Sequence, residues 1–124
     1  YDDALKELKL LSKKYPDEPI LYNLQGACYA ETKRLKLAIE NYSKAIKVDP
    51  KYYKAHYNLA NTFHENGQLN LAISSFKSAL SIEPHYAEAH NNLGNIYMEL
   101  NKLDDAINSY EKAVAFKSNY LEAH

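Results

Sequence analysis

Apolar side chains recur along this chain at the spacing of an α-helix. Within residues 53–65 they stand three or four positions apart, and the same spacing returns within residues 69–82. Gly67 follows the first run and suits the position just past a helix end, because glycine adopts positive φ without steric cost. Pro84 follows the second run, and proline disfavours helix in the residue before it. The pattern predicts two helices joined by a tight turn.

This pair of predicted helices repeats with a fixed period, marked by Pro16, Pro50 and Pro84 at intervals of 34 residues. No stretch alternates between apolar and polar positions with a period of two, so we expect no strand. A period of this length is typical of an α-solenoid, in which antiparallel helix pairs stack and each buries its apolar face against its neighbours. The predicted units are the second helix of a partial repeat at 1–18, complete repeats at 19–52, 53–86 and 87–120, and the start of a further repeat at 121–124.

Equivalent positions of successive periods carry the same kinds of residue. The repeat at 53–86 has His56, Leu59, Ala60, Phe63, Ala72, Phe76, Ala79 and Pro84. The repeat at 87–120 has His90, Leu93, Gly94, Tyr97, Ala106, Tyr110 and Ala113. This pattern resembles the tetratricopeptide repeat family, from which Gln25 departs in place of a leucine and Ser118 in place of a proline. The resemblance implies an all-α, right-handed superhelical solenoid that binds proteins and has no catalytic activity.

The predicted units do not begin or end on a whole repeat. Residues 1–18 match only the second half of a repeat, and residues 121–124 match only its opening. We therefore expect a window cut from a longer array, the alternative being a short natural protein with a poor C-terminal cap. The last predicted helix, 103–116, keeps apolar residues such as Ile107 and Val114 with little to cover them, which predicts end-to-end self-association.

Composition and charge argue against several classes of partner. The net charge of −1 over 124 residues provides no basic field for nucleic acid. No apolar run approaches the roughly 20 residues needed to span a bilayer, so we expect no membrane insertion. Cys28 is the single cysteine and cannot form an internal disulfide; we expect it to be a small buried core residue. With nucleic acid and membranes disfavoured, we expect the partner to be a protein or peptide.

The chain has five histidines, but their spacing argues against a metal site. His56, His90 and His124 occupy the same position of successive repeats, and equivalent helices lie on the order of 10 Å apart. Zinc needs its ligands about 2 Å from one point. We expect these residues to pack between helices, and His64 and His85 to be solvated. With no phosphate-binding loop, nucleophile elbow or paired-cysteine spacing, the sequence predicts no metal, no cofactor and no catalytic residue.

The resemblance also implies where a ligand binds, because the first helix of each repeat lines a concave groove in this family. The residues at groove positions in the second and third repeats include Lys54, Tyr57, Asn58, Asn61, Glu65, Asn91, Asn92, Asn95 and Glu99. Asparagine is a poor helix former, so its recurrence here requires an explanation. A carboxamide can pair with both the C=O and the N–H of an extended peptide. The row resembles the asparagine ladder of O-linked N-acetylglucosamine transferase, and residues 87–97 resemble the repeats of that enzyme.

The alternative is that these asparagines are ordinary background, solvated or bonded between adjacent helices. In the first repeat the groove positions include Ile20, Leu24 and Ala27, so we expect the row to stop there. Glu31, Glu65 and Glu99 are also equivalent and predict either an acidic stripe along the groove or merely solvated helix ends. 

A clamp for the C-terminal carboxylate of heat-shock chaperones, frequent in this family, is disfavoured. Its lysine and arginine positions correspond here to residues without positive charge, and Glu88 would repel the ligand. Three hypotheses remain: a module that binds an extended peptide in its groove, a scaffold that stacks end to end, and the substrate-recruiting arm of a larger glycosyltransferase or sulfotransferase.

Overall fold

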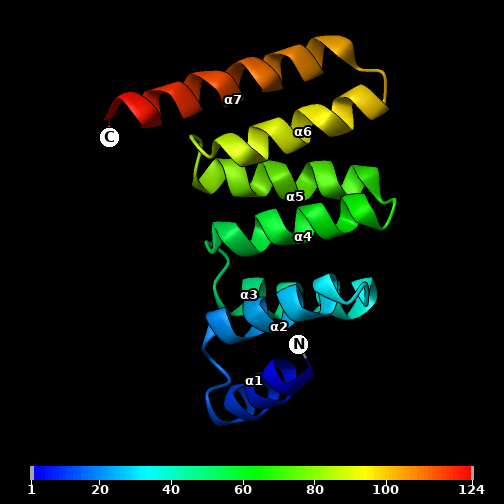
Figure 1. Ribbon diagram of the computed structural model, residues 1–124, viewed down its shortest axis with the longest axis vertical. Coiled ribbons are helices and arrows are strands. Elements are labelled where there is room, and N and C mark those ends of the chain that lie inside the picture. Colours follow the sequence, from blue (N-terminus) through cyan, green and yellow to red (C-terminus); the bar gives the residue numbers. More distant parts are fainter. Residues whose placement is uncertain (1, 124) are drawn as a thin grey trace.

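The described part of the chain folds into seven helices without a strand (Figure 1). The computed structural model describes the backbone of residues 2–123 and the side chains of residues 2–117. The helices are α1 (Asp2–Lys14), α2 (Pro19–Glu31), α3 (Leu35–Val48), α4 (Tyr53–Glu65), α5 (Leu69–Ile82), α6 (Ala87–Glu99) and α7 (Leu103–Ala123). The all-α prediction is confirmed, and α4 and α5 have the bounds predicted from the apolar spacing.

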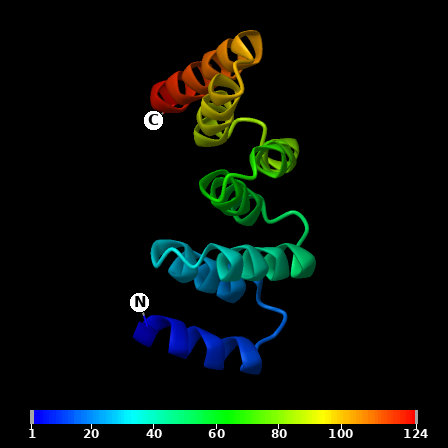
Figure 2. The ribbon, with the colours of Figure 1, turned by 90° about the vertical axis from the view of Figure 1, so that its right-hand side faces the viewer.

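The helices stack into an elongated array instead of closing around one core (Figures 1 and 2). Helix α2 packs on α3, α4 on α5 and α6 on α7, and each pair contacts the next. Helices α2, α4 and α6 also contact one another in that order, and Figure 2 shows α4 and α6 on one side of the array with α5 on the other. We call the surface that these three helices share the α2–α4–α6 face.

The turn inside each repeat is closed by a residue with positive φ. Gly67 has φ 79°, and the equivalent Lys33 and Asn101 have φ 62° and 60°. The next residue, Gln68, donates its backbone N–H to the carbonyl of Phe63 at 2.8 Å, which satisfies a carbonyl that the end of α4 leaves unpaired. Glycine adopts this conformation freely, whereas lysine and asparagine are less stable in it because their Cβ atoms lie too close to the backbone.

Prolines end the second helix of a repeat, as predicted. Helices α3 and α5 each stop two residues before a proline, at Val48 and Ile82. Helix α7 has no proline to stop it, because Ser118 occupies the equivalent position. We expected this helix to end at Phe116, but it continues to Ala123. The assignment of residues 121–124 to a further repeat remains a prediction.

Small residues allow the two helices of a repeat to approach closely. A Cβ atom built on Gly26 would lie 2.6 Å from the ring of Tyr42, and one built on Gly94 would lie 2.8 Å from the ring of Tyr110. Alanines are fully buried at the equivalent and neighbouring positions, which are Ala38, Ala45, Ala60, Ala72, Ala79 and Ala106. The core is therefore a layer of aromatic rings set against small side chains, as dense helix packing requires.

A hydrogen bond ties the first helix of each complete repeat to the loop before it. The Nε2 atoms of His56 and His90 bond the main-chain oxygens of Pro50 and Pro84, each at 2.9 Å. Since a carbonyl only accepts, both rings carry the proton on Nε2. The Tyr22 hydroxyl does the same for Pro16, also at 2.9 Å. The expected packing role is correct for His90, which is 7% exposed, but these rings also hold the loop. 

Gln25, the departure from the family leucine, is buried at the position where later repeats have Leu59 and Leu93. It is 4% exposed, and its Nε2 has no hydrogen-bond partner among the described residues. Burying an amide without a partner costs free energy, because its hydrogen bonds to water are lost and not replaced. The first repeat therefore contains a buried polar atom without a hydrogen-bond partner among the described residues, at a position where the other two repeats have a leucine.

Candidate functional site

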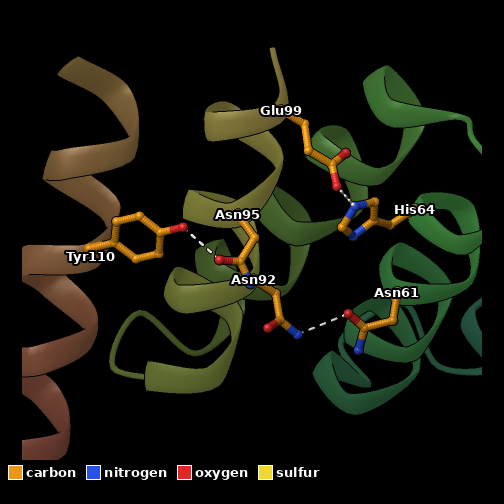
Figure 3. Close-up of polar contacts among 6 residues, drawn as sticks. All are labelled: Asn61, His64, Asn92, Asn95, Glu99 and Tyr110. Atoms are coloured by element: carbon orange, nitrogen blue, oxygen red, sulfur yellow. Dashed lines mark hydrogen bonds and ion pairs between the residues drawn. The ribbon is translucent and has the colours of Figure 1, made fainter. Parts of the chain in front are cut away.

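Asparagines connect successive helices along the α2–α4–α6 face. The Nδ2 of Asn58 on α4 donates to the Oδ1 of Asn23 on α2 at 3.1 Å. One repeat further on, the Nδ2 of Asn92 on α6 donates to the Oδ1 of Asn61 on α4 at 2.9 Å (Figure 3). The same nitrogen of Asn92 donates to the hydroxyl of Tyr57 at 3.0 Å. Asn23 adds one residue of the first repeat to these contacts, and the expectation that the ligand-binding row stops there remains a prediction.

The remaining two asparagines differ from each other. Asn95 is exposed, and its Oδ1 accepts a 2.6 Å hydrogen bond from the hydroxyl of Tyr110 on α7 (Figure 3). Asn91 is also exposed and lines a hollow of about 360 Å³ between α4, α6 and α7. Tyr57, Asn92 and Tyr110 line the same hollow. The predicted asparagine row is therefore partly engaged between helices and partly open to solvent.

Tyrosines support this hollow from the side of α4. The ring of Tyr57 lies 4.7 Å from that of Tyr86 and 5.9 Å from that of Phe76, centroid to centroid. Tyr86 also meets Tyr53 edge-on at 5.4 Å. Burial, followed by the neighbouring Tyr57, raises the pKa of Tyr86 to about 12. These contacts fix the Tyr57 ring, so its hydroxyl is held where Asn92 can reach it.

The predicted acidic stripe is partly neutralised. Glu65 forms an ion pair with Lys33, which lies in the turn between α2 and α3 of the preceding repeat. The Glu65 carboxylate raises the pKa of Lys33 above its ordinary value. The Oε1 of Glu99 lies 3.0 Å from the Nε2 of His64 (Figure 3). His64 was expected to be solvated, and instead it contacts the next repeat. The remaining predicted residue, Lys54, is exposed on α4.

Cys28, expected to be buried, is half-buried. It packs against the core cluster that contains Tyr29 and Tyr42, and it also lines a second hollow, of about 390 Å³, between α1 and α2. Leu11 of α1 and Leu24 of α2 line the same hollow and are 42% and 44% exposed. 

The described residues contain neither a cluster of metal ligands nor a membrane-spanning helix. Among them, no group of three or more His, Cys, Asp or Glu side chains is placed to hold a metal ion. His56 and His90 each bond a proline carbonyl, and His124 lies outside the described residues. Within the same residues, no helix has the length and apolar character required to cross a membrane.

Family models match most of the chain. The model described as TPR repeat matches residues 26–67 and 60–100, and the model described as Tetratricopeptide repeat matches residues 87–120. The chain belongs to the tetratricopeptide repeat family. Tetratricopeptide repeat domains are protein–protein interaction modules and are typically not catalytic.

Known proteins resemble the chain over part or nearly all of its length. A peroxisomal targeting signal receptor of Candida albicans is 34% identical over 59 residues, which are 48% of this chain and 10% of that receptor. The chain thus corresponds to about a tenth of this curated relative. The crystal structure of MamA superposes with a TM-score of 0.93 at 22% identity, covering 98% of this chain and 71% of MamA. The first such domain of Spaghetti (RPAP3), bound to the HSP90 peptide SRMEEVD, superposes with a TM-score of 0.79 at 22% identity, covering 82% of this chain and 81% of that one.

The sequence alone missed several partners on the α2–α4–α6 face. Tyr110 contacts Asn95 from a different helix, and Tyr86 supports Tyr57 from the loop before α6. The contacts between His64 and Glu99, and between Asn58 and Asn23, join residues about one period apart. These pairs are separated by 35 residues, one more than the period, so comparing side chains at that separation is the signal that finds them.

Proposed function

We propose that this domain binds an extended segment of a partner protein along the α2–α4–α6 face. In this proposal Asn58, Asn61, Asn91, Asn92 and Asn95 bind the main chain of the ligand. Tyr57, Lys54, Glu65 and Glu99 border them. The observation that carries the proposal is the hollow of about 360 Å³ on this face, which Tyr57, Asn91 and Asn92 line and onto which the exposed Asn91 opens. The bonds of Asn58 to Asn23 and of Asn92 to Asn61 hold two of the carboxamides in place but also fit asparagines that serve only the helices.

The observed contacts determine which atoms of these carboxamides remain for a ligand. Asn92 uses Nδ2 as the donor to Asn61 and to Tyr57, so its Oδ1 is the atom suited to accept an N–H from a peptide. Asn61 accepts through Oδ1, so its Nδ2 is suited to donate to a peptide C=O. Neighbouring donors and acceptors match the alternation of C=O and N–H along an extended chain.

The energy of such a row is limited. A hydrogen bond contributes about 1 kcal/mol net, so five asparagines would supply about 5 kcal/mol. A micromolar complex needs roughly 8 kcal/mol. Contacts to ligand side chains must therefore supply the difference, and Tyr57 and the exposed Val114 offer apolar surface in the same hollow as Asn91 and Asn92.

The charge of the face favours a ligand without excess negative charge. Glu65, Glu88 and Glu99 are exposed on or beside it. An acidic peptide such as the SRMEEVD bound by the RPAP3 domain would approach these carboxylates, and like charges repel. We therefore expect this domain to bind that peptide at least tenfold more weakly than a neutral or basic one.

Peptide selection followed by asparagine variants tests the proposal. Peptides of 12 residues would be selected from a displayed random library and their affinities measured by fluorescence anisotropy. The combined variant Asn58→Ala, Asn61→Ala, Asn92→Ala and Asn95→Ala should weaken binding at least tenfold. Asn70→Ala, on the exposed side of α5, is the matched control and should change nothing. Unchanged affinity in the combined variant, together with higher stability, would mean that the asparagines serve only the helices.

The exposed side of α7 favours self-association as a second function. Leu103, Ile107 and Val114 are 51%, 55% and 66% exposed, although the equivalent residues of α5 are half-buried. An apolar stripe of this kind is typical of a surface that binds another molecule. Sedimentation equilibrium up to millimolar concentration tests this function, and a strict monomer would exclude it. Ile107→Lys with Val114→Lys should dissociate any oligomer.

The similarity of residues 87–97 to the repeats of O-linked N-acetylglucosamine transferase supports a further proposal. In it, the array is the substrate-recruiting arm of a larger glycosyltransferase or sulfotransferase. The coding sequence on either side of this segment tests that proposal, because a catalytic domain there would be recognisable and its absence would exclude the role.

A further inference from the structure

A hollow of about 450 Å³ lies between α5 and α7, on the side of α6 that is turned away from the asparagine row. The residues of α6 that line it are His90, Leu93 and Tyr97, three or four positions apart. They form a different stripe of this helix from Asn91 and Asn95, so the hollow is separate from the site proposed above. Its volume is within the roughly 300–1,000 Å³ typical of ligand pockets. We call it the α5–α7 groove.

Neighbouring helices of the array form the two walls of this groove. Helix α5 contributes Lys77, Leu80 and Ser81, and α7 contributes Asp105, Asn108, Ser109, Lys112 and Phe116. The α7 residues lie on the opposite stripe of that helix from the exposed Ile107 and Val114, where a further helix of an array would pack. The groove therefore stays open in an array that continues in either direction.

Two lysines line the α5–α7 groove from its opposite walls. Lys77 belongs to α5 and Lys112 to α7, and both are exposed. Neither takes part in an ion pair among the described residues. Within that part of the chain, both ammonium groups are therefore left for a ligand.

The other repeats do not offer such a pair. Lys9 and Lys44 occupy the equivalent positions two repeats earlier, but both are engaged. Lys9 lies 5.7 Å from the centroid of the Tyr29 ring, and Lys44 forms an ion pair with Glu40 at 3.8 Å. In the repeat between them the equivalent residues are serines, Ser43 and Ser78.

The rest of the lining combines apolar surface with one buried hydroxyl group. Leu80 and Phe116 are half-buried and offer the apolar surface. Ser109 is 5% exposed, and its hydroxyl makes no hydrogen bond to the described residues, whereas the Ser81 hydroxyl bonds the carbonyl of Ser78 at 2.7 Å. A nearly buried donor of this kind favours an acceptor oxygen of a ligand.

The formal charge of the lining favours a ligand with a single negative charge. Lys77 and Lys112 contribute two positive charges and Asp105 contributes one negative charge, so the lining carries +1 with histidine neutral. One carboxylate balances this charge. A phosphate group, with about −2 at neutral pH, would exceed it and be repelled by Asp105. The apolar surface beside the lysines complements an apolar side chain next to that carboxylate.

We infer that the α5–α7 groove is a second binding site, which takes an acidic side chain next to a bulky apolar one in a partner protein. The carboxylate pairs with Lys77 and Lys112 and accepts the hydroxyl proton of Ser109. The apolar side chain contacts Leu80 and Phe116. This inference goes beyond the proposed function, and its charge preference is opposite to that of the α2–α4–α6 face, which glutamates border.

Nuclear magnetic resonance of the isotope-labelled protein locates the binding of short probes. The probes are capped 12-residue peptides of alanine and serine with Phe-Glu, Phe-Gln or Ala-Glu at the centre. At millimolar concentration the Phe-Glu peptide should shift the amide signals of Lys77, Ser109 and Lys112. It should leave those of Ser43 and Ser78 in place, and the other two peptides should cause shifts at least threefold smaller. No shift at the three groove residues, or equal shifts with all three peptides, would overturn the inference.

A matched pair of double variants tests the two lysines. Lys77→Ser with Lys112→Ser gives the groove the serines of the preceding repeat and should weaken binding of the Phe-Glu peptide at least fivefold. Lys6→Ser with Lys36→Ser removes the same charge from exposed positions of α1 and α3 and should change the affinity less than twofold. Circular dichroism confirms that each variant folds. Equal losses in both variants would mean that the peptide responds to net charge alone, which contradicts the assignment.

Further outcomes separate this inference from the proposed function. The combined asparagine variant should bind the Phe-Glu peptide as the unaltered protein does. If that variant loses the peptide, the peptide occupies the α2–α4–α6 face and the inference is wrong. If inorganic phosphate shifts the signals of Lys77 and Lys112 as far as the peptide does, the groove takes any anion, which also overturns the inference. The same holds if these signals shift as protein concentration rises without peptide, because a second copy of the chain then occupies the groove.

Discussion

The Nε2 of His90 bonds the main-chain oxygen of Pro84 at 2.9 Å, and this contact joins the start of α6 to the loop that ends α5. Tyr22 makes the equivalent contact in the first repeat with a hydroxyl group. Two chemically different side chains, a histidine and a tyrosine, therefore make the same hydrogen bond to a proline carbonyl at one position of the repeat. What the position requires is a planar ring with a donor at its far end.

Replacing His90 tests this requirement. His90→Phe keeps a ring but removes the donor, and should lower the free energy of unfolding by about 1 kcal/mol because the hydrogen bond between the buried His90 ring and the Pro84 oxygen is lost. His90→Tyr should recover most of that loss, since Tyr22 makes the same bond. Urea unfolding followed by circular dichroism measures both. Equal stability of the two variants would show that the ring alone matters.

Gln25→Leu should stabilise the domain. The change removes a buried amide nitrogen without a partner and restores the residue type of Leu59 and Leu93, so we expect a gain of about 1–2 kcal/mol. Gln68→Leu, on an exposed turn, is the control and should change stability by less than about 0.5 kcal/mol. Thermal and urea unfolding check the gain, and a loss of stability would mean that Gln25 makes a contact through water.

Asn101→Gly should also stabilise the domain, because φ is 60° at this position and glycine has no Cβ to clash there. We expect about 0.5 kcal/mol, since asparagine tolerates this conformation better than most residues. Asn66→Gly is the matched control: Asn66 has φ −83°, so glycine there should destabilise by about the same amount. Differential scanning calorimetry distinguishes the two signs. 

Alkaline pH should weaken the fold through Tyr42. Burial, with a smaller effect from Glu31, raises its pKa from about 10 to about 12. Between these values the unfolded chain has lost the proton and the folded chain keeps it, so the free energy of unfolding falls as pH rises, by about 2 kcal/mol for this residue. Below pH 10 its contribution stays constant.

Two phenylalanine variants check this dependence by urea unfolding at pH 8, 10 and 11. Tyr42→Phe has no proton to lose at this position and should make the decline shallower, leaving the part that Tyr86 contributes with its own pKa of about 12. Tyr15→Phe, at a residue 48% exposed, should retain it. Parallel slopes for Tyr42→Phe and the unaltered protein would assign the decline to other groups.

The fold followed closely from the sequence because local signals agreed with one another. The apolar spacing, Gly67 and Pro84 together predicted α4 and α5 with their observed bounds. Helix α7 departs from its prediction where one of these signals is missing, since Ser118 does not stop a helix. Prediction was accurate wherever a residue acts on its own neighbours in the chain.

The candidate site was less predictable, because its contacts join different repeats. The position of Asn92 followed from the period, but its bonds to Tyr57 and Asn61 depend on the angle at which α6 meets α4. The exposure of Cys28 depends in the same way on how α1 lies against α2. Spacing along one helix carries no information about such angles.

The bonds that Asn58 makes to Asn23, and Asn92 to Asn61, lie on one side of the stack only. Opening the angle between successive repeats on that side would stretch them, so they stiffen the array against unbending. In the proposed binding mode a ligand uses the Oδ1 of Asn92 and the Nδ2 of Asn61, and so adds bonds between the same two helices. The domain then behaves as an elastic element whose curvature and stiffness depend on occupancy, and small-angle scattering would record binding as a change in the length of the molecule.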